Sequence, residues 1–423
     1  MNVGIIGMGG FAGAHHDAIA ELERGGDCRL ICTCDPNMGG FSERACELEF
    51  ERRGVRFFGD YVEMLDACRN ELDVVTVPTP VPLHATMHEA CVMRGIPVYL
   101  EKPPTVNYSE LDDMLAVDAT AAKLTNVGFN FIIENERRML KRRIVDGEFG
   151  AVRKVCFSGL WPRSSGYYGR AKWAGKLMLD EALVLDSCMS NALAHYVHNV
   201  LFWAGCEELF SWAEVESVTA QLYRAHDIQG FDTVFATAET STNVDLALAI
   251  SHACDGPHRH REIVVCEKAT IVYVVNEDYR VYWDGGQTES GKTQESVGPR
   301  ENLTAYFAYL RGEADRPVTR LVDSRPFVRL CDLVYLASGR INQVPRECVD
   351  RHPEAAGSPN PESTMSAIQG LDTVFEEFLR SGAFPDSQGA AWGRSGGSAT
   401  PADLTRLPGV VQEMVTAANH QER

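Results

Sequence analysis

The chain lacks several features that define whole classes of proteins. Its 423 residues contain no apolar run that approaches the length of a membrane span. They also contain no long basic tract, and 59 acidic against 40 basic residues give a formal net charge of −19. This charge argues against nucleic acid or an anionic membrane as a partner. Met1 leads directly into a predicted strand, which leaves no room for a secretory signal peptide.

A disulfide framework is missing as well. The 13 cysteines are an odd number scattered singly along the chain, which is typical of reduced thiols and predicts a cytoplasmic protein. Cys28, Cys32 and Cys34 lie on one predicted strand, where buried small apolar residues explain them better than a metal site does. At 45% hydrophobic residues the chain can bury a sizeable core, divided between two or three domains.

What the chain does have is a glycine-rich turn at its start. The predicted strand Val3–Ile6 runs into a predicted helix over residues 12–24 through the turn residues Gly7, Met8, Gly9, Gly10, Phe11 and Ala12. In a dinucleotide-binding turn the first glycine allows the tight bend, the second lets the backbone approach a pyrophosphate, and the helix N-terminus supplies N–H groups. A tight turn that binds no nucleotide is the alternative.

Asp35 ends the next predicted strand, residues 29–34. It lies at about the distance expected for a carboxylate that binds a ribose 2′-hydroxyl, and it would repel a 2′-phosphate. The pattern therefore favours NAD over NADP as the cofactor. A role as a turn cap before Pro36 and Asn37 stays open. His15 and His16, just after the glycine turn, are expected to pack on this helix and not to react.

Another short apolar run, residues 97–100, ends abruptly in Glu101, Lys102 and Pro103. This sequence places a lysine at the carboxyl end of a predicted strand. In open α/β sheets that edge is where ligands bind.

The pattern of apolar residues predicts two domains. Residues 1–126 alternate short β-branched runs with amphipathic helical stretches, which predicts a doubly wound, parallel, six-stranded Rossmann sheet. Residues 127–423 have longer alternating strands and predict an α+β domain with a large, mainly antiparallel open sheet. The strands expected in this second domain are residues 152–159, 214–223, 233–249, 261–275 and 280–283. Expected helices are residues 134–145, 188–203, 364–380 and 402–418, and expected flexible loops are residues 353–362 and 387–399.

Taken together, the glycine turn, Asp35, the run Val74–Pro80 followed by His84, and Glu101–Pro103 resemble the Gfo/Idh/MocA family of sugar and cyclitol oxidoreductases. The resemblance covers the N-terminal domain closely and the rest in outline. It implies a Rossmann domain followed by an α/β domain whose open sheet lies behind the active site. It also implies a homodimer or homotetramer formed through that sheet.

The resemblance further implies roles for single residues. Thr79, Pro80 and His84 would lie beside the nicotinamide ribose, and Glu101 and Lys102 over the nicotinamide, with a cis bond between Lys102 and Pro103. Lys102 would donate a hydrogen bond or proton near the reacting oxygen while hydride passes between the substrate carbon and the cofactor.

The family's usual D, x, G, x, H motif finds its best match at Asn191–His195, with asparagine in place of aspartate. His195 would be the acid or base, whereas an asparagine cannot take a proton at neutral pH. Asp186 supplies the missing carboxylate, or the asparagine is normal for this branch. Asn191, His195, His198 and Asn199 are expected to share one helical face that lines a pocket or satisfies buried backbone groups. A zinc site built from His195, His198 and Asp186 is the less favoured alternative.

Residues 161–176 are dense in aromatic and cationic side chains. Sugars are commonly held by aromatic faces and by bidentate donors. Arg163, Tyr168 and Trp173 are therefore expected to bind substrate, together with Tyr167, Arg170 and Lys172. A surface loop that caps the sheet or joins subunits is the alternative.

The leading interpretation is an NAD-dependent oxidoreductase acting on a secondary alcohol or ketone of a sugar, amino sugar or cyclitol. A redox-neutral lyase or hydrolase that oxidises its sugar transiently is the second. The third is a non-catalytic protein that senses a nucleotide. A fold analogy does not identify the substrate.

Overall fold

The computed structural model describes residues 1–295, 297–354 and 362–421. The chain divides into two compact units, residues 1–133 with 296–325 and residues 134–295 with 326–423. The expected single boundary near residue 126 differs from this division in two respects. The N-terminal unit extends to residue 133 and takes in a second segment from much later in the chain. No helix of the described residues is both long and apolar enough to cross a membrane.

The N-terminal unit is built on the predicted six-stranded sheet. All neighbouring strands are parallel and follow the order β3-β2-β1-β4-β5-β6, which is the doubly wound Rossmann arrangement. The strands are β1 (Asn2–Ile6), β2 (Arg29–Cys34), β3 (Arg56–Phe58), β4 (Val74–Val77), β5 (Val98–Leu100) and β6 (Asn126–Val127). Short apolar runs such as β1 and β4 are nearly continuous in their burial, as expected of strands covered on both faces.

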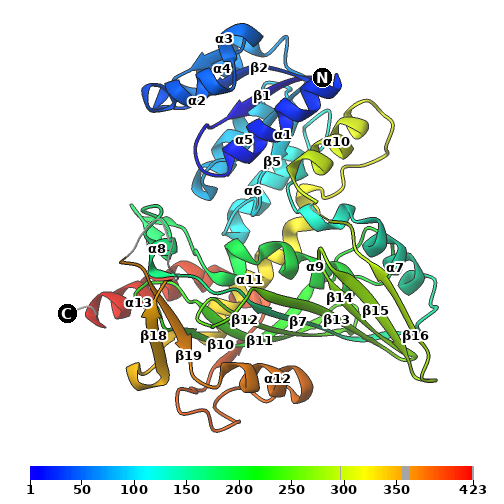
Figure 1. Ribbon diagram of the computed structural model, residues 1–423, viewed down its shortest axis with the longest axis vertical. Helices are drawn as coiled ribbons and strands as arrows, with labels where there is room; N and C mark the ends of the chain where they lie inside the picture. The colour runs from blue at the N-terminus through cyan, green and yellow to red at the C-terminus, as the bar shows by residue number, and fades with distance from the viewer. Residues whose placement is uncertain (296, 355–361, 422–423) are drawn as a thin grey trace. The chain divides into compact units, whose positions relative to one another are not determined.

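Helices cover both faces of this sheet (Figure 1). They are α1 (Ala12–Gly25), α2 (Ser42–Glu47), α3 (Phe50–Arg53), α4 (Tyr61–Cys68), α5 (His84–Val92), α6 (Tyr108–Asp118) and α10 (Pro299–Leu310). Helix α10 comes from the second segment of the unit and lies beside α1. Its residues Leu303, Tyr306 and Phe307 share one apolar cluster with Ile19 and Leu22 of α1. The returning segment therefore supplies part of this unit's core.

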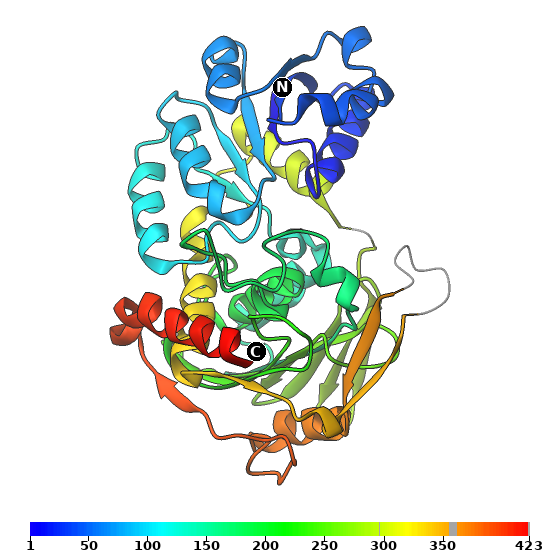
Figure 2. The same cartoon turned by 90° about the vertical axis from the view of Figure 1, so that its left-hand side faces the viewer.

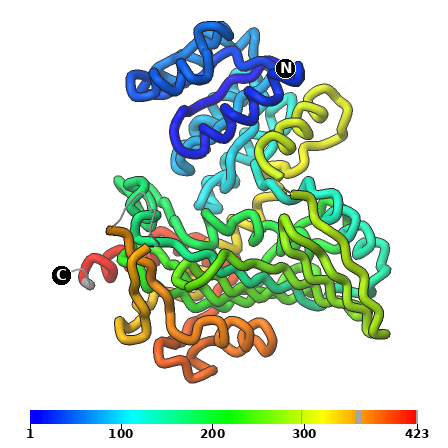
Figure 3. The backbone as a smooth tube through the Cα atoms, viewed as in Figure 1, coloured from blue at the N-terminus to red at the C-terminus, as the bar shows by residue number. Residues whose placement is uncertain are grey.

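The second unit is built on a ten-stranded sheet, whose strands run across Figure 1 and are drawn as a trace in Figure 3. The main path runs β16-β15-β14-β13-β7-β12-β11-β10-β17, and β20 pairs with β10. The pairs β7–β12 and β10–β17 are parallel and the others antiparallel, so the predicted mainly antiparallel sheet is confirmed. Its strands are β7 (Val152–Leu160), β10 (Val215–Arg224), β11 (Thr233–Thr240), β12 (Asp245–Ser251), β13 (Arg259–Cys266), β14 (Ala269–Val274), β15 (Asp278–Trp283), β16 (Thr288–Lys292), β17 (Ile341–Gln343) and β20 (Gly397–Ala399).

Several predicted elements of this unit were wrong in their bounds. The expected strand 233–249 is the hairpin β11–β12, and the expected strand 261–275 falls in the hairpin β13–β14. The expected helix 364–380 begins as strand β19 (Thr364–Ile368), which pairs with β18 (Val349–Pro353), and only then forms α12 (Leu371–Ser381). Residues 397–399, expected in a flexible loop, are strand β20. Most of the other expected loop, residues 355–361, lies outside the described residues.

Helices α9 (Ala194–Ala204) and α12 pack on opposite faces of this sheet (Figure 2). The remaining elements of the unit are α7 (Asn135–Val145), α8 (Ser165–Tyr168), α11 (Arg325–Ser338), α13 (Leu407–Gln421) and the short strands β8 (Met178–Leu179) and β9 (Ala182–Leu183). On the α12 side, Phe375 and Phe378 meet Phe235 of β11 and Trp392 in one buried cluster.

Candidate functional site

Four neighbouring strands of the N-terminal unit bring the predicted cofactor residues to one edge of the sheet. Strands β2, β1, β4 and β5 lie side by side, and their carboxyl ends lead to Asp35, Gly7, Thr79 and Glu101 respectively. The strand order reverses between β1 and β4. This topological switch point is where open α/β sheets bind their ligands.

The glycine turn presents backbone N–H groups just before α1, and the carbonyl groups of the turn accept the first N–H groups of the helix itself. Gly7 and Gly10 have φ angles of 114° and 58°, which glycine adopts without strain. No side chain caps α1, and its first turn holds no acidic residue. Within the described residues the N–H groups of Gly9, Gly10 and Phe11 have no hydrogen-bond acceptor. Unpaired N–H groups and an uncompensated helix dipole fit a phosphate group.

His16 holds the glycine turn through a hydrogen bond to its backbone. Its Nε2 lies 3.1 Å from the carbonyl oxygen of Gly7, and the side chain is buried. Burial lowers the pKa of His16 to about 4. The ring is therefore neutral near pH 7, with its Nε2–H donated to Gly7.

Asp35 contacts the same turn. One carboxylate oxygen accepts the N–H of Met8 at 3.1 Å, and the other accepts the N–H of Asn37 at 2.9 Å. The second bond is the turn cap that the sequence left open as an alternative. The first places the carboxylate beside the glycine turn, where a 2′-phosphate would meet its negative charge.

Glu101 is a buried carboxylate that positions the backbone at Lys102. Its Oε1 lies 2.9 Å from Nε2 of His15, and its Oε2 accepts the N–H of Lys102 at 3.1 Å. The Lys102–Pro103 bond is cis, as the resemblance implied. A Cβ on Gly128 would lie 2.7 Å from Oε1 of Glu101, so only glycine leaves room for this carboxylate. Lys102 itself is half-buried.

His84 joins two of these strand ends. Its Nε2 lies 2.8 Å from the carbonyl oxygen of Thr79, and its Nδ1 lies 2.9 Å from that of Pro103. Burial lowers the pKa of His84, whereas the two carbonyl contacts favour its protonated form. The His84 side chain is fully buried. Pro80 starts the turn that carries it, as the N-cap of the 3-10 helix Val81–Leu83.

The second unit holds the predicted substrate residues. Asp186 is buried and its carboxylate bonds to two groups, the N–H of Gly175 at 2.6 Å and the Nδ2 of Asn191 at 2.7 Å. Asn191 lies in a π-helix, Cys188–Ala192, which leads directly into α9. Such π-helical turns are frequent at functional sites. Asp186 thus orients the side-chain amide of Asn191.

The expected single polar face over residues 191–199 is divided by this π-helix. His195 is half-buried in the first turn of α9. His198 is buried against Trp212, and Asn199 donates to Glu262 at 2.8 Å. His198 and Asn199 therefore belong to the interior of the unit. In the described part of the chain no three His, Cys, Asp or Glu side chains are grouped to hold a metal ion.

The aromatic segment stacks largely on itself. The guanidinium of Arg163 lies 4.4 Å from the ring centre of Trp161 and 4.3 Å from that of Tyr167. That of Arg170 lies 3.6 Å from Tyr167 and 4.7 Å from Trp173. These cation–π contacts make a ladder of alternating rings and cations. They occupy ring faces that the sequence assigned to a sugar.

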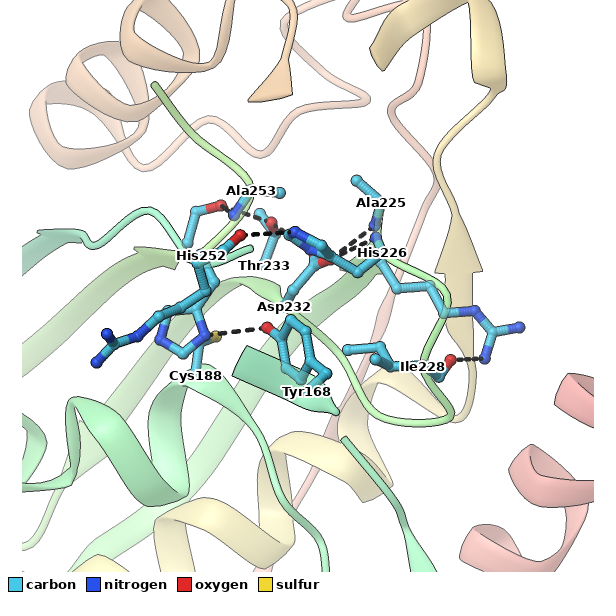
Figure 4. A network of polar contacts seen from close by, with 12 residues as sticks. Tyr168, Cys188, Ala225, His226, Ile228, Asp232, Thr233, His252 and Ala253 are labelled. Carbon is cyan, nitrogen blue, oxygen red and sulfur yellow. Dashed lines mark hydrogen bonds and ion pairs between the residues drawn. The ribbon is translucent and has the colours of Figure 1, made fainter. Parts of the chain in front are cut away.

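A polar cluster that the sequence did not predict lies where strands β10 and β12 end and β11 begins (Figure 4). Asp232, fully buried before β11, bonds through Oδ2 to Nδ1 of His226 at 2.7 Å, and to the backbone N–H groups of Ala225 and His226. Nearby, the hydroxyl of Tyr168 lies 3.0 Å from Nδ1 of His252. Burial keeps the pKa of His252 well below its usual value. Polar residues at strand ends are the sequence signal for such a cluster. Because residues 233–249 were expected to form one strand, the ends of β11 and β12 were not identified from the sequence.

The fold and the glycine turn define a two-unit protein with a Rossmann nucleotide-binding domain. Residues 1–129 match the model of the oxidoreductase family with an NAD-binding Rossmann fold, Gfo/Idh/MocA. Inositol 2-dehydrogenase from Rhodococcus jostii is 30% identical over 154 residues, which cover 36% of this chain and 40% of that protein. UDP-N-acetylglucosamine 3-dehydrogenase from Acidithiobacillus ferrooxidans is 28% identical over 117 residues, covering 28% of this chain and 33% of that protein. The matches thus span less than half of the length of these relatives.

Solved structures extend the likeness to both units. The WlbA dehydrogenase from Chromobacterium violaceum, in complex with NADH and UDP-GlcNAcA, superposes with a TM-score of 0.63 over 79% of this chain and 93% of its own, at 23% identity. An oxidoreductase from Agrobacterium radiobacter, in complex with NAD+, L-tartaric acid and magnesium, gives a TM-score of 0.65 over 79% and 95%, at 16% identity. At these identities the likeness concerns the fold. The family match therefore concerns residues 1–129, which match the NAD-binding Rossmann fold of the Gfo/Idh/MocA oxidoreductases.

Proposed function

We propose that the protein is an NAD-dependent oxidoreductase that interconverts a secondary alcohol and a ketone on a sugar, amino sugar or cyclitol. The observation that carries the proposal is the edge at β1, β2, β4 and β5, where an uncapped helix N-terminus, Asp35 and Lys102 follow adjacent strands. Relatives named as inositol and UDP-N-acetylglucosamine dehydrogenases support the substrate class.

NAD would be held by the glycine turn and Asp35. The N–H groups of Gly9, Gly10 and Phe11, beside Ala12, would bind the pyrophosphate, and Asp35 would accept from the adenosine ribose. Bound nicotinamide would exchange hydride with the substrate carbon. The carboxylate beside the turn supports NAD over NADP.

Lys102 would donate a hydrogen bond or a proton at the reacting oxygen. Its backbone is held by Glu101, which is fixed in turn by His15, so the lysine starts from a rigid base. His84 would keep the loops that carry Thr79 and Pro103 in register. Rigid support of this kind is what positioning a catalytic group requires.

In the second unit we propose His195 as the acid or base, with Asn191 as a donor or acceptor to a substrate hydroxyl. Asp186 holds the Asn191 amide at 2.7 Å, which supports a positioning role for that carboxylate. Arg163, Tyr168 and Trp173 would contribute through exposed edges of the stacked segment, because its ring faces already carry guanidinium groups.

A screen of polyols, sugars and cyclitols for NAD reduction by the full-length protein tests the proposal. With a substrate in hand, Lys102→Met should keep NAD affinity while turnover falls by about 10²- to 10⁴-fold. Lys268→Met, at an exposed turn, is the matched control and should behave as wild type. Unchanged turnover in Lys102→Met would refute the assignment. NAD that co-purifies and shows no net reduction with substrate would favour the redox-neutral alternative.

We further propose a homodimer or homotetramer formed through the large sheet, in a reducing, cytoplasmic compartment. Alternate residues of β14, Thr270, Val272 and Val274, are only partly buried. All 13 cysteines are free thiols. Light scattering on the purified protein tests the assembly, and a monomer at micromolar concentration would contradict it.

A further inference from the structure

A pocket of the second unit is lined by more cationic than anionic side chains. It has a volume of about 360 Å³ and lies where β10 ends, against the segment that carries β17 and β18. Its polar lining includes Arg224, Arg346, Arg351, His226, Asp227 and Gln343. Three guanidinium groups thus face one carboxylate, in a chain whose net charge is −19.

The arginines are oriented by neutral groups. Arg224 is buried at 5% exposure, and it donates to the Oε1 of Gln343 at 2.9 Å and to the carbonyl oxygens of Ile228 and Gln229 at 3.0 and 3.2 Å. Figure 4 labels Ile228, whose carbonyl oxygen accepts the bond from Arg224, near the cluster at Asp232. Arg351 donates to the carbonyl oxygen of Ala225 at 3.2 Å. These bonds hold the guanidinium groups of Arg224 and Arg351 in place, and all of the acceptors are uncharged.

Arg346 and Arg351 are the two exposed arginines of the pocket lining. Neither Arg346 nor Arg351 forms an ion pair with any other residue that the structure describes. In contrast, Arg143 pairs with both Glu148 and Glu289. Like charges that line one pocket repel each other unless an anion binds between them.

The chemistry of the lining selects the ligand. Guanidinium groups recognise phosphate and carboxylate oxygens, often in bidentate fashion. They repel metal cations. The ring nitrogens of His226 are already engaged by Asp232 and by the carbonyl oxygen of Arg163. The volume suits a small molecule.

We propose that this pocket binds the phosphate or carboxylate group of a small metabolite. The pocket belongs to the second unit, and its proposed ligand binding does not depend on the proposed dehydrogenase activity. Two sources share this chemistry, a charged group on the substrate and a free anionic effector.

Calorimetric titration of the full-length protein with pyrophosphate and with citrate tests the proposal. Wild type should bind at least one of these probes, and the double variant Arg346→Gln/Arg351→Gln should weaken that binding by about tenfold or more. Arg394→Gln is the control, because the guanidinium of this exposed arginine of the same unit donates to the carbonyl oxygens of Ala391 and Gly393. All three proteins should bind NAD equally, which shows that they are folded.

Three results would overturn the proposal: no binding of either probe to wild type, equal binding to the double variant, or an equal loss in Arg394→Gln. Kinetics with the substrate found in the screen separate the two sources. Competition between probe and substrate identifies a substrate subsite, and non-competitive behaviour identifies an effector site. Failure of the dehydrogenase proposal would leave the titration unaffected.

Discussion

His16 links the protonation of one buried ring to the shape of the glycine turn. Its pKa is about 4 in the folded protein against 6.5 for an ordinary histidine. Between these values the unfolded chain binds more protons, so stability falls as the pH drops from about 6.5 to about 4. This one residue accounts for up to about 3 kcal/mol of that loss.

We expect His16→Gln to have a shallower loss of stability below pH 6.5 than wild type, because a glutamine amide donates to Gly7 without titrating. Chemical denaturation at a series of pH values measures the difference. Parallel curves for the two proteins would show that His16 does not contribute to the slope. His420, exposed near the chain end in α13, offers a control histidine.

The hydrogen bond from Asn191 to Asp186 means that an aspartate cannot replace Asn191 without a loss of stability. Asn191→Asp would place a second carboxylate within hydrogen-bond distance of the first, in a largely buried place. We expect a loss of about 1–3 kcal/mol of stability, since the pair must share a proton. The swap Asp186→Asn/Asn191→Asp should recover most of this loss. Thermal unfolding of wild type and the two variants checks both statements, and a fully stable single variant would contradict them.

At the scale of elements, one buried ionic network ties helices to the large sheet. Arg137 of α7 donates to Glu134 at 2.9 Å and to both oxygens of Glu262 on β13. Asn199 and Trp203 of α9 also donate to Glu262. Most buried polar groups of proteins are paired in this way, and here one guanidinium group serves two buried carboxylates.

Removing the arginine should therefore be costly. Arg137→Met leaves two buried carboxylates without their cation, and we expect a loss of about 3–5 kcal/mol. Arg142→Met, at an exposed position of the same helix, should change stability by less than about 0.5 kcal/mol. Urea unfolding monitored by fluorescence compares the two, and similar midpoints would exclude a central role for the network.

Which elements could be predicted follows from their local signals. The first two strands and α1 were located to within a residue, because glycine and aspartate punctuate short apolar runs there. The turn between β11 and β12 passes through Ser241, Thr242 and Asn243 with neither glycine nor proline, so the apolar alternation seemed unbroken. The turn at Glu267 and Lys268 is similar. Strand β19 forms only through its partner β18, which no local pattern reveals.

The candidate site was predictable to the same degree. The cofactor edge rests on motifs that are contiguous in sequence, and the structure brings Gly7, Asp35, Thr79 and Glu101 to neighbouring strand ends. The cluster of His226, Asp232 and His252 joins three separate strand ends through long-range pairing. The π-helix before His195 was equally hidden, since a helical pattern does not distinguish π from α turns.

At the scale of the whole molecule, the N-terminal unit is discontinuous. Leu303, Tyr306 and Phe307 of α10 complete the core around Ile19 and Leu22. We expect Leu303→Ala to cost about 2–5 kcal/mol of stability in the full chain. Differential scanning calorimetry with and without NAD measures the loss, and an unchanged transition would contradict this role for α10.

A fragment of residues 1–133 should therefore fold poorly on its own, although it contains the whole segment that the family model matches. We expect weak or absent NAD binding and exposed apolar surface, detectable by dye fluorescence. Adding residues 296–325 through a flexible linker should restore binding. A stable fragment that binds NAD as tightly as the full chain would contradict this expectation.

The same discontinuity sets an order of events during synthesis. The apolar face of α1 is made early, whereas the helix that packs on it, α10, ends at Leu310, 177 residues after residue 133. At ribosomal speeds this interval is roughly 10–40 s. The nascent nucleotide-binding domain is thus incomplete for most of translation, and it becomes a substrate for chaperones before it becomes a binding site for NAD.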